Sequence, residues 1–122
     1  MSEYAFTTPQ CHIEAYIKEI PPNYPIAQWA IDIGIFNPET DAWLVSITVG
    51  NVTNAINLRK SGIGSKVLDD FESTCQKNNV VRIIGVFQPS NDSDPEEVAI
   101  WYMRRGYELR PIGSTIFIIK DI

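Results

Sequence analysis

The amino-acid sequence predicts a mixed α/β domain of the α+β class, with a central mixed, mostly antiparallel β-sheet of about six strands and two main helices. Apolar residues alternate with others in two runs, 29–36 and 43–49, separated by turn-forming residues as in a β-hairpin. Two later segments, 64–77 and 96–105, carry apolar residues at helical spacing, and the apolar run 80–87 between them has the length of a buried strand. With one strand before the hairpin and two after the last helix, the predicted order is β-β-β-α-β-α-β-β.

The single domain is expected to span residues 1–122, because this length is enough for one hydrophobic core and not for two. Residues 1–10 show no periodicity and are expected to form a loose N-terminal arm. The segment 11–20 fits both the period of a strand and that of a helix, and its β-branched content favours a strand. Pro21 and Pro22 end either element.

The predicted hairpin has regular alternation in both strands. The first strand places four large apolar residues on one face, and residues 37–41 supply turn chemistry before the second strand. The second strand is likewise expected to place its large apolar residues on one face over its full length. The shared faces are Trp29, Ile31, Ile33 and Ile35 in the first strand and Trp43, Val45, Ile47 and Val49 in the second.

The two helices are predicted from their apolar stripes and their ends. In 64–77 one stripe includes Cys75, which is therefore interpreted as a core residue rather than a reactive thiol. The second helix has Ser93 or Asp94 as a cap, a proline at its first position and two glutamates in its first turn, and Gly106 follows its end. Strands are predicted from 107 to 109 and from 115 to 120.

Charge is unevenly distributed along the chain. Residues 1–57 carry one basic residue against six acidic ones, whereas residues 58–122 carry nine of each, which accounts for the net charge of −5. An acidic half disfavours a nucleic-acid partner, which needs basic clusters. It suits a cationic amine, and it is equally well explained by solubility.

Nothing in the sequence predicts export, a membrane span or a metal site. The N-terminus lacks a basic region followed by an apolar segment, and no run approaches the roughly 18 apolar residues of a membrane-spanning helix. Cys11 and Cys75 are expected to be free thiols, since two cysteines do not make a disulfide framework. A soluble, cytoplasmic protein is expected.

One stretch between the hairpin and the first helix has the composition of an anion site. Residues 59–65 read Arg-Lys-Ser-Gly-Ile-Gly-Ser, and two glycines before a helix allow a phosphate to approach unpaired N–H groups. A tight turn explains the glycines equally well. The spacing does not fit a Walker A loop, and Val67 stands where a dinucleotide fingerprint needs Gly or Ala.

The pattern Arg-x-x-Gly-x-Gly, carried by Arg59, Gly62 and Gly64, resembles the pyrophosphate loop of the Gcn5-related N-acetyltransferases (GNAT family). A second motif of that family, a helix ending in Tyr-x-x-x-Gly-Phe, is matched by Tyr102 and Gly106, with tyrosine in place of phenylalanine. The resemblance covers residues 26 to 122 approximately. The sequence departs from the family in the long polar stretch 50–57, in the reduced N-terminal elements, and in a proline at position 95 where an asparagine is frequent.

The resemblance implies an acyltransferase that moves an acetyl group from acetyl-CoA to an amine, either a small molecule or a protein lysine. The pyrophosphate would lie on the loop, the pantetheine between splayed strands near Val49 and Val86, and a main-chain amide near Val49 would stabilise the oxyanion. Tyr102 would protonate the departing thiolate. The cofactor contact of the asparagine that is frequent at position 95 would be either lost or taken over by Asn91. The loop residues concerned are Arg59, Lys60, Ser61, Gly62, Ile63, Gly64 and Ser65.

The general base is left open by the sequence. Members of the family often use a glutamate on the strand that here spans 42–49, and this strand carries no acid. Asp32 on the adjacent predicted strand, Glu14 and a chain of water molecules are the candidates. A nucleophile and base pair of Cys11 and His12 is disfavoured, because neighbours on a strand point to opposite faces.

A non-catalytic acyl-CoA-binding or protein-interaction module with the same fold is the alternative function. The absent strand glutamate and the reduced N-terminal elements favour it. The oligomeric state is left open, with a homodimer among the possibilities.

Overall fold

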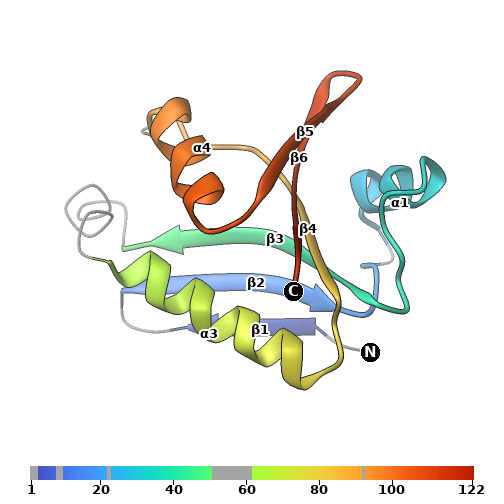
Figure 1. Ribbon diagram of the computed structural model, residues 1–122, viewed down its shortest axis with the longest axis horizontal. Coiled ribbons are helices and arrows are strands. Elements are labelled where there is room, and N and C mark those ends of the chain that lie inside the picture. Colours follow the sequence, from blue (N-terminus) through green and yellow to red (C-terminus); the bar gives the residue numbers. More distant parts are fainter. Residues whose placement is uncertain (1–2, 8–9, 22, 51–61, 92) are drawn as a thin grey trace.

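The computed structural model describes residues 3–7, 10–21, 23–50, 62–91 and 93–122, and it contains a six-stranded sheet with strand order β1-β2-β3-β4-β6-β5 (Figure 1). Three helices accompany the sheet within these ranges. The elements are β1 (Glu3–Thr7), β2 (Cys11–Ile17), α1 (Pro25–Asp32), β3 (Asp41–Val49), α3 (Ile63–Lys77), β4 (Arg82–Val86), α4 (Pro95–Arg104), β5 (Glu108–Ile112) and β6 (Thr115–Asp121).

The sheet is mixed and mostly antiparallel, as the sequence predicts. Strand β3 pairs antiparallel with β2 and parallel with β4, and every other pair is antiparallel. A parallel pair of consecutive strands needs a long crossover, which here contains α3.

The core has two layers, one on each face of the sheet. The first layer, which we call the α3 face, joins α3 and α4 to the alternate buried residues of β2, among them Ile13 and Ala15. The second, the α1 face, is centred on Trp43, which is fully buried and meets Tyr24 and Phe36 edge to face. Helix α1 covers one end of this second face only (Figure 1).

The predicted strand at 29–36 is wrong. Residues 25–32 form helix α1, which begins with Pro25 at its first position and buries Ala27 and Ala30, three residues apart. The ring of Trp29 stacks on Phe117 of β6 at 5.4 Å. Alternation in the sequence matched a strand, but packing of this short segment across the sheet favours a helix.

The predicted loose arm is also wrong in part, because residues 3–7 form strand β1 and pair with β2 from Glu3–Tyr16 to Thr7–His12. Strand β3 pairs with β2 rather than with the segment 29–36. The observed order is therefore β-β-α-β-α-β-α-β-β among the described residues. The helices α3 and α4, strand β4 and the last two strands lie where the sequence predicts them to within a few residues.

Candidate functional site

Strands β3 and β4 separate part of the way along their length. Their parallel pairing runs from Asp41–Arg82 to Leu44–Gly85. Beyond Leu44, β3 continues to Val49 beside β2, whereas β4 ends at Val86 beside β6. The backbone edge of β3 that faces β4 has no strand partner among the described residues over this second half. Figure 1 shows the resulting divergence, with α4 and the end of β3 on the same side of the molecule.

A β-bulge in β3 lies at the point of separation. Glu14 of β2 is opposite Ser46, and the next residue, Ala15, is opposite Leu44, so Val45 has no partner in β2. The extra residue reverses the alternation: Val45 packs on the α1 face, whereas Ile47 packs on the α3 face. The prediction that Trp43, Val45, Ile47 and Val49 share one face is therefore wrong beyond the bulge.

Gly85 is the β4 residue at the last pair before the separation. A Cβ atom built on it would lie 2.8 Å from the carbonyl oxygen of Leu44 and 3.3 Å from the Cδ1 atom of Ile118. Only glycine allows the two backbones to come this close. An isolated glycine within the apolar run 80–87 was a signal for such an approach that the sequence interpretation did not use.

The first turn of α3 lies beside the open end of the site. Gly62 precedes the helix with φ of +84°, a backbone conformation that favours glycine, and the first helical N–H groups follow it. A Cβ atom on Gly64 would lie 3.3 Å from Val49 Cγ2 and 3.8 Å from Trp101 Cζ2. The structure thus brings the predicted residues Val49, Gly62, Ile63, Gly64 and Ser65 together. Arg59, Lys60 and Ser61 lie outside the described residues.

Helix α4 closes the other side of the opening with aromatic rings. Trp101 donates a hydrogen bond from Nε1 to Ser65 Oγ at 3.1 Å and so links α4 to the first turn of α3. The ring of Tyr102 meets those of Phe87 and Tyr107 edge to face, at 6.4 and 5.5 Å. Burial raises the pKa of Tyr102 to about 12, so the phenol stays protonated through the neutral range. Trp101 was not predicted as a site residue.

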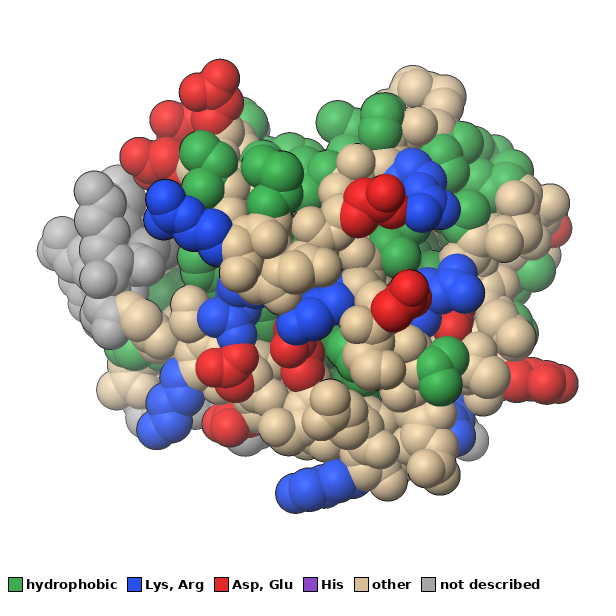
Figure 2. Space-filling view, in the orientation of Figure 1, with side chains coloured by type: hydrophobic (Ala, Val, Ile, Leu, Met, Phe, Trp, Pro, Cys, Tyr) green, Lys and Arg blue, Asp and Glu red, His purple; other side chains and the backbone are tan. Residues whose placement is uncertain are grey.

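Ionic and hydrogen-bonded contacts hold α4 and the last strands on α3. Arg105 pairs with Asp69, and one turn further along α3 the carboxylate of Glu72 accepts from Tyr107 Oη at 2.9 Å and from Lys120 Nζ at 2.8 Å. Figure 2 shows basic and acidic side chains interspersed on this side of the molecule. These contacts fix the distance between Tyr102 and the start of α3.

Two predicted site residues lie away from this group. Asp32, the candidate base, is exposed on α1 and accepts a hydrogen bond from Gln28 Nε2 at 3.1 Å, so it is not on a strand next to β3. Helix α1 lies at the end of the sheet opposite the start of α3 (Figure 1), so the predicted place of Asp32, on a strand beside β3, is wrong. Asn91 is exposed in the segment between β4 and α4.

The first residue of β3 is an acid, Asp41, and its carboxylate is bonded to the turn that precedes the strand. Asp41 is fully buried, and its carboxylate accepts hydrogen bonds from the Asn37 backbone N–H at 2.8 Å and from Thr40 Oγ1 at 3.0 Å. It also lies 3.8 Å from Arg82 Nε. Asp41 therefore stabilises the turn before β3. Within the described ranges no group of three or more histidine, cysteine or acidic residues is placed to hold a metal ion, and no helix is long and apolar enough to cross a membrane.

Comparison of the sequence with protein-family models and with curated proteins finds no match. Solved structures do match the fold. PaiA N-acetyltransferase from Thermoplasma acidophilum, in complex with coenzyme A, aligns with 93% of this chain at 15% identity and a TM-score of 0.59. A GNAT family acetyltransferase from Elizabethkingia anophelis with acetyl-CoA bound aligns with 93% at 12% identity and a TM-score of 0.56.

A third match is Ard1 from Thermoplasma volcanium, which aligns with 93% of this chain at 15% identity and a TM-score of 0.57. The chain spans only 54% of the PaiA chain, 63% of the Ard1 chain and 69% of the Elizabethkingia chain. At these low sequence identities, the matches show a shared fold and do not show a shared reaction. The architecture of this chain is that of the Gcn5-related N-acetyltransferases.

Proposed function

We propose that this chain binds acetyl-CoA and transfers its acetyl group to an amine, either a small molecule or a protein lysine. The observation that carries the proposal is the separation of β3 from β4 after the Leu44–Gly85 pair, at a bulge, with a helix N-terminus and a tyrosine-bearing helix on either side of the opening. An unpaired strand edge offers backbone N–H and C=O groups to an extended ligand. The amide groups of pantetheine are such a ligand.

In the proposed complex, the first-turn N–H groups of α3 hold the pyrophosphate, with Arg59, Lys60 and Ser61 preceding them in the chain. The pantetheine lies along the free edge of β3. The thioester then reaches the bulge at Val45 rather than the strand end at Val49, because the strands meet at the former and are apart at the latter. A main-chain N–H at the bulge would stabilise the oxyanion.

Calorimetric titration with acetyl-CoA tests the binding step, with free acetylated cysteamine as the control ligand that lacks the pyrophosphate and adenosine. We expect acetyl-CoA to bind with a dissociation constant in the micromolar range and the control ligand to bind much more weakly. Absence of binding below about 1 mM acetyl-CoA, which corresponds to a binding free energy of about −4 kcal/mol, would contradict the proposal.

Replacing Tyr102 by phenylalanine tests its role as the general acid. Because its pKa is raised to about 12, Tyr102 carries its proton at neutral pH and can donate a hydrogen bond to the sulfur, on which negative charge develops as the C–S bond breaks. We expect Tyr102→Phe to lower kcat by about 10²-fold with little change in the affinity for acetyl-CoA. Tyr24→Phe, on the far end of the α1 face, is the matched control and should retain the parental kcat. Equal rates in the Tyr102 variant and the parent would remove Tyr102 from the reaction.

The non-catalytic alternative is favoured by one observation, the engagement of Asp41 in a buried turn, which leaves β3 without an acid for catalysis. A single measurement, the release of free coenzyme A, distinguishes the enzyme from the binding module. A protein that binds acetyl-CoA tightly, yet releases no more free coenzyme A with a broad panel of primary amines and lysine peptides than without them, would be a binding module.

A further inference from the structure

We propose that Glu14 of β2 receives the acceptor amine and takes its proton, an inference that rests on the proposed acyl transfer. Strand β2 has regular alternation: Cys11, Ile13 and Ala15 are buried under α3, so the even-numbered residues point to the α1 face. Tyr16 confirms this direction, because it packs with the core of the α1 face. Glu14 therefore points to the side of the sheet opposite α3 and α4.

The bulge brings polar residues of β3 to the same face. Beyond Val45, residues 47 and 49 pack on the α3 face, so Ser46 and Thr48 point to the α1 face. The register pairs Glu14 with Ser46 and His12 with Thr48. Residues directly opposite in an antiparallel pair have Cβ atoms about 5 Å apart, so these four form one polar patch.

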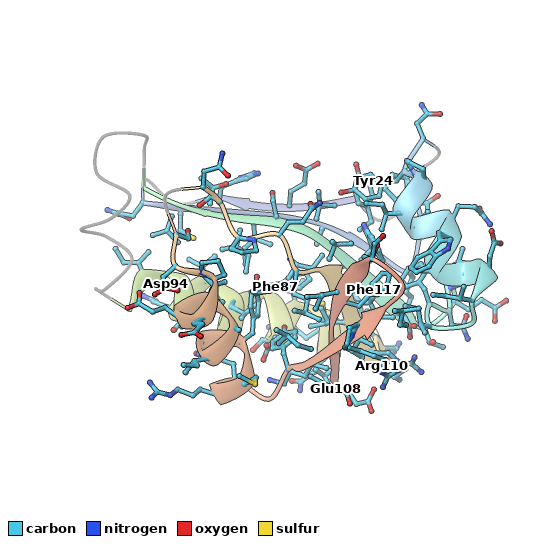
Figure 3. The ribbon with its side chains drawn as sticks, turned by 90° about the horizontal axis from the view of Figure 1, so that it is seen from above. Tyr24, Phe87, Asp94, Glu108, Arg110 and Phe117 are labelled. Carbon is cyan, nitrogen blue, oxygen red and sulfur yellow. The ribbon has the colours of Figure 1, made fainter. Side chains whose placement is uncertain are left out.

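The described elements leave this patch uncovered. Helix α1 packs on the same face but only at its far end, around Trp43 and Tyr24 (Figure 1). Figure 3, a view along the sheet, shows α1 at one end of the upper side and α3 and α4 below. Glu14 is half-buried, which leaves its carboxylate within reach of a ligand.

Glu14 lies beside the point where β3 and β4 separate. Its partner Ser46 is the residue that follows the bulge, and Leu44, which precedes the bulge, forms the last pair with β4. A thioester at the bulge would thus have Tyr102 on the α3 face and Glu14 on the α1 face. The amine can then approach one face of the thioester carbonyl from the α1 face of the sheet, while the sulfur lies near Tyr102.

The proposed step balances as follows. The ammonium group of the acceptor gives one proton to the Glu14 carboxylate, and its nitrogen lone pair forms a C–N bond to the thioester carbon. Collapse of the intermediate breaks the C–S bond, and the departing thiolate accepts a hydrogen bond from Tyr102. The amide nitrogen releases its extra proton to solvent, Glu14 returns its proton to solvent, and the thiolate is protonated by solvent after it leaves. An acid at this position selects a cationic primary amine over a neutral nucleophile.

On the strand of Glu14 the nearest titratable groups on the same face are His12 and Tyr16, and the residues opposite it are Ser46 on β3 and Ala5 on β1. Besides the groups on its own strand, the register includes Glu3 of β1, which is paired with Tyr16. Loss of the carboxylate would leave deprotonation of the amine to solvent.

Glu14→Gln tests the inference in the full chain, with spermidine and a lysine methyl ester as probes and acetyl-CoA in excess. We expect kcat at pH 7 to fall by about 10²-fold, and the rate of the variant to rise close to tenfold per pH unit up to pH 9, because only amine already neutral in solution reacts. The control Glu39→Gln, an exposed carboxylate in the turn before β3, should retain the parental rate and pH profile.

The outcomes separate this inference from the function on which it rests. A Glu14→Gln variant with the parental rate and pH profile overturns the role of Glu14 while acyl transfer stands. A variant that loses its rate together with its affinity for acetyl-CoA also overturns it, since a base on the acceptor side does not hold the cofactor. A parent that binds no acetyl-CoA, or that acetylates neither probe, overturns the assignment for cationic primary amines, and the first of these results also rejects the proposed function.

Discussion

Replacing Gly85 by alanine is expected to lower the free energy of unfolding by about 2 to 3 kcal/mol, a large effect for one methyl group. The new Cβ atom would lie 2.8 Å from the backbone oxygen of Leu44, which cannot rotate away as a side-chain atom does. Relief requires β3 and β4 to move apart at their last pair. Denaturation by urea, followed by circular dichroism, measures the loss.

The matched control is Gly113→Ala in the turn between β5 and β6. A Cβ atom there meets nothing within 4 Å, and only its φ of +61° opposes the substitution, so we expect a loss of about 1 kcal/mol. The two variants also differ in binding. Displacement at Gly85 moves the bulge and should weaken acetyl-CoA binding about tenfold, whereas the control should bind as the parent does. Similar stabilities of the two variants would show that the close approach at Leu44 does not constrain the sheet.

Much of the second half of the fold could be predicted from local signals. Asp94 caps α4 by accepting from the Glu96 N–H at 2.9 Å, and Pro95 follows it, as the cap pattern predicted. The apolar stripe of α3 is buried with Cys75 fully enclosed, and both cysteines are free thiols. These features follow from residues near one another in the chain, which is why the sequence sufficed.

The first half depended on packing between distant residues. The run 29–36 alternates as a strand does, but the sheet position beside β3 is taken by β2, and the hydrophobic side chains of 25–32 instead meet Phe117 across the sheet. Residues 3–7 carry no clear period, and they form a strand because β2 offers an edge to pair with. Which segment pairs with a given strand depends on residues far apart in the chain, so it cannot be predicted from a short stretch of sequence.

The sequence predicted the two motifs of the candidate site but not the bulge that sets the geometry between them. The residues around Gly62 and Gly64 and the helix with Tyr102 were identified from their patterns, and the structure places them on either side of one opening. The bulge at Val45 could not be predicted, because the alternation of apolar residues in 43–49 continues through it. The place of Asp32 was missed for a different reason, because its segment forms helix α1 and not a strand beside β3.

Raising the pH above 9 is expected to destabilise the protein strongly. Burial, assisted by the charge of Glu72, raises the pKa of the Cys75 thiol to about 12, and burial raises the pKa of Tyr102 to about 12. The pKa of Tyr107 is also raised, by burial first and then by Glu72, which accepts its hydrogen bond. In the unfolded chain these groups ionise near their ordinary values, about 8.5 for a thiol and about 10 for a phenol.

The sign of the effect follows from proton binding. Between the unfolded and the native pKa values the native state holds protons that the unfolded state has lost, so the free energy of unfolding falls as pH rises. The contribution is complete at neutral pH and is lost from about pH 9 to pH 12. One pKa unit corresponds to about 1.4 kcal/mol, so the raised pKa values of Cys75 and Tyr102 together account for on the order of 7 kcal/mol, comparable with the whole stability of a small domain.

Urea denaturation at a series of pH values, with a reductant present, measures this loss, and Cys75→Ala identifies its main source. The variant should lose about 1 kcal/mol of packing at pH 7 and then show a shallower decline than the parent between pH 9 and pH 12. Equal slopes in the two proteins would show that the thiol is not the group responsible. The burial of Tyr102 also matters for the proposed reaction. Its phenol ionises only near pH 12, so it remains a hydrogen-bond donor at every pH at which the protein is folded and β3 is paired with β4.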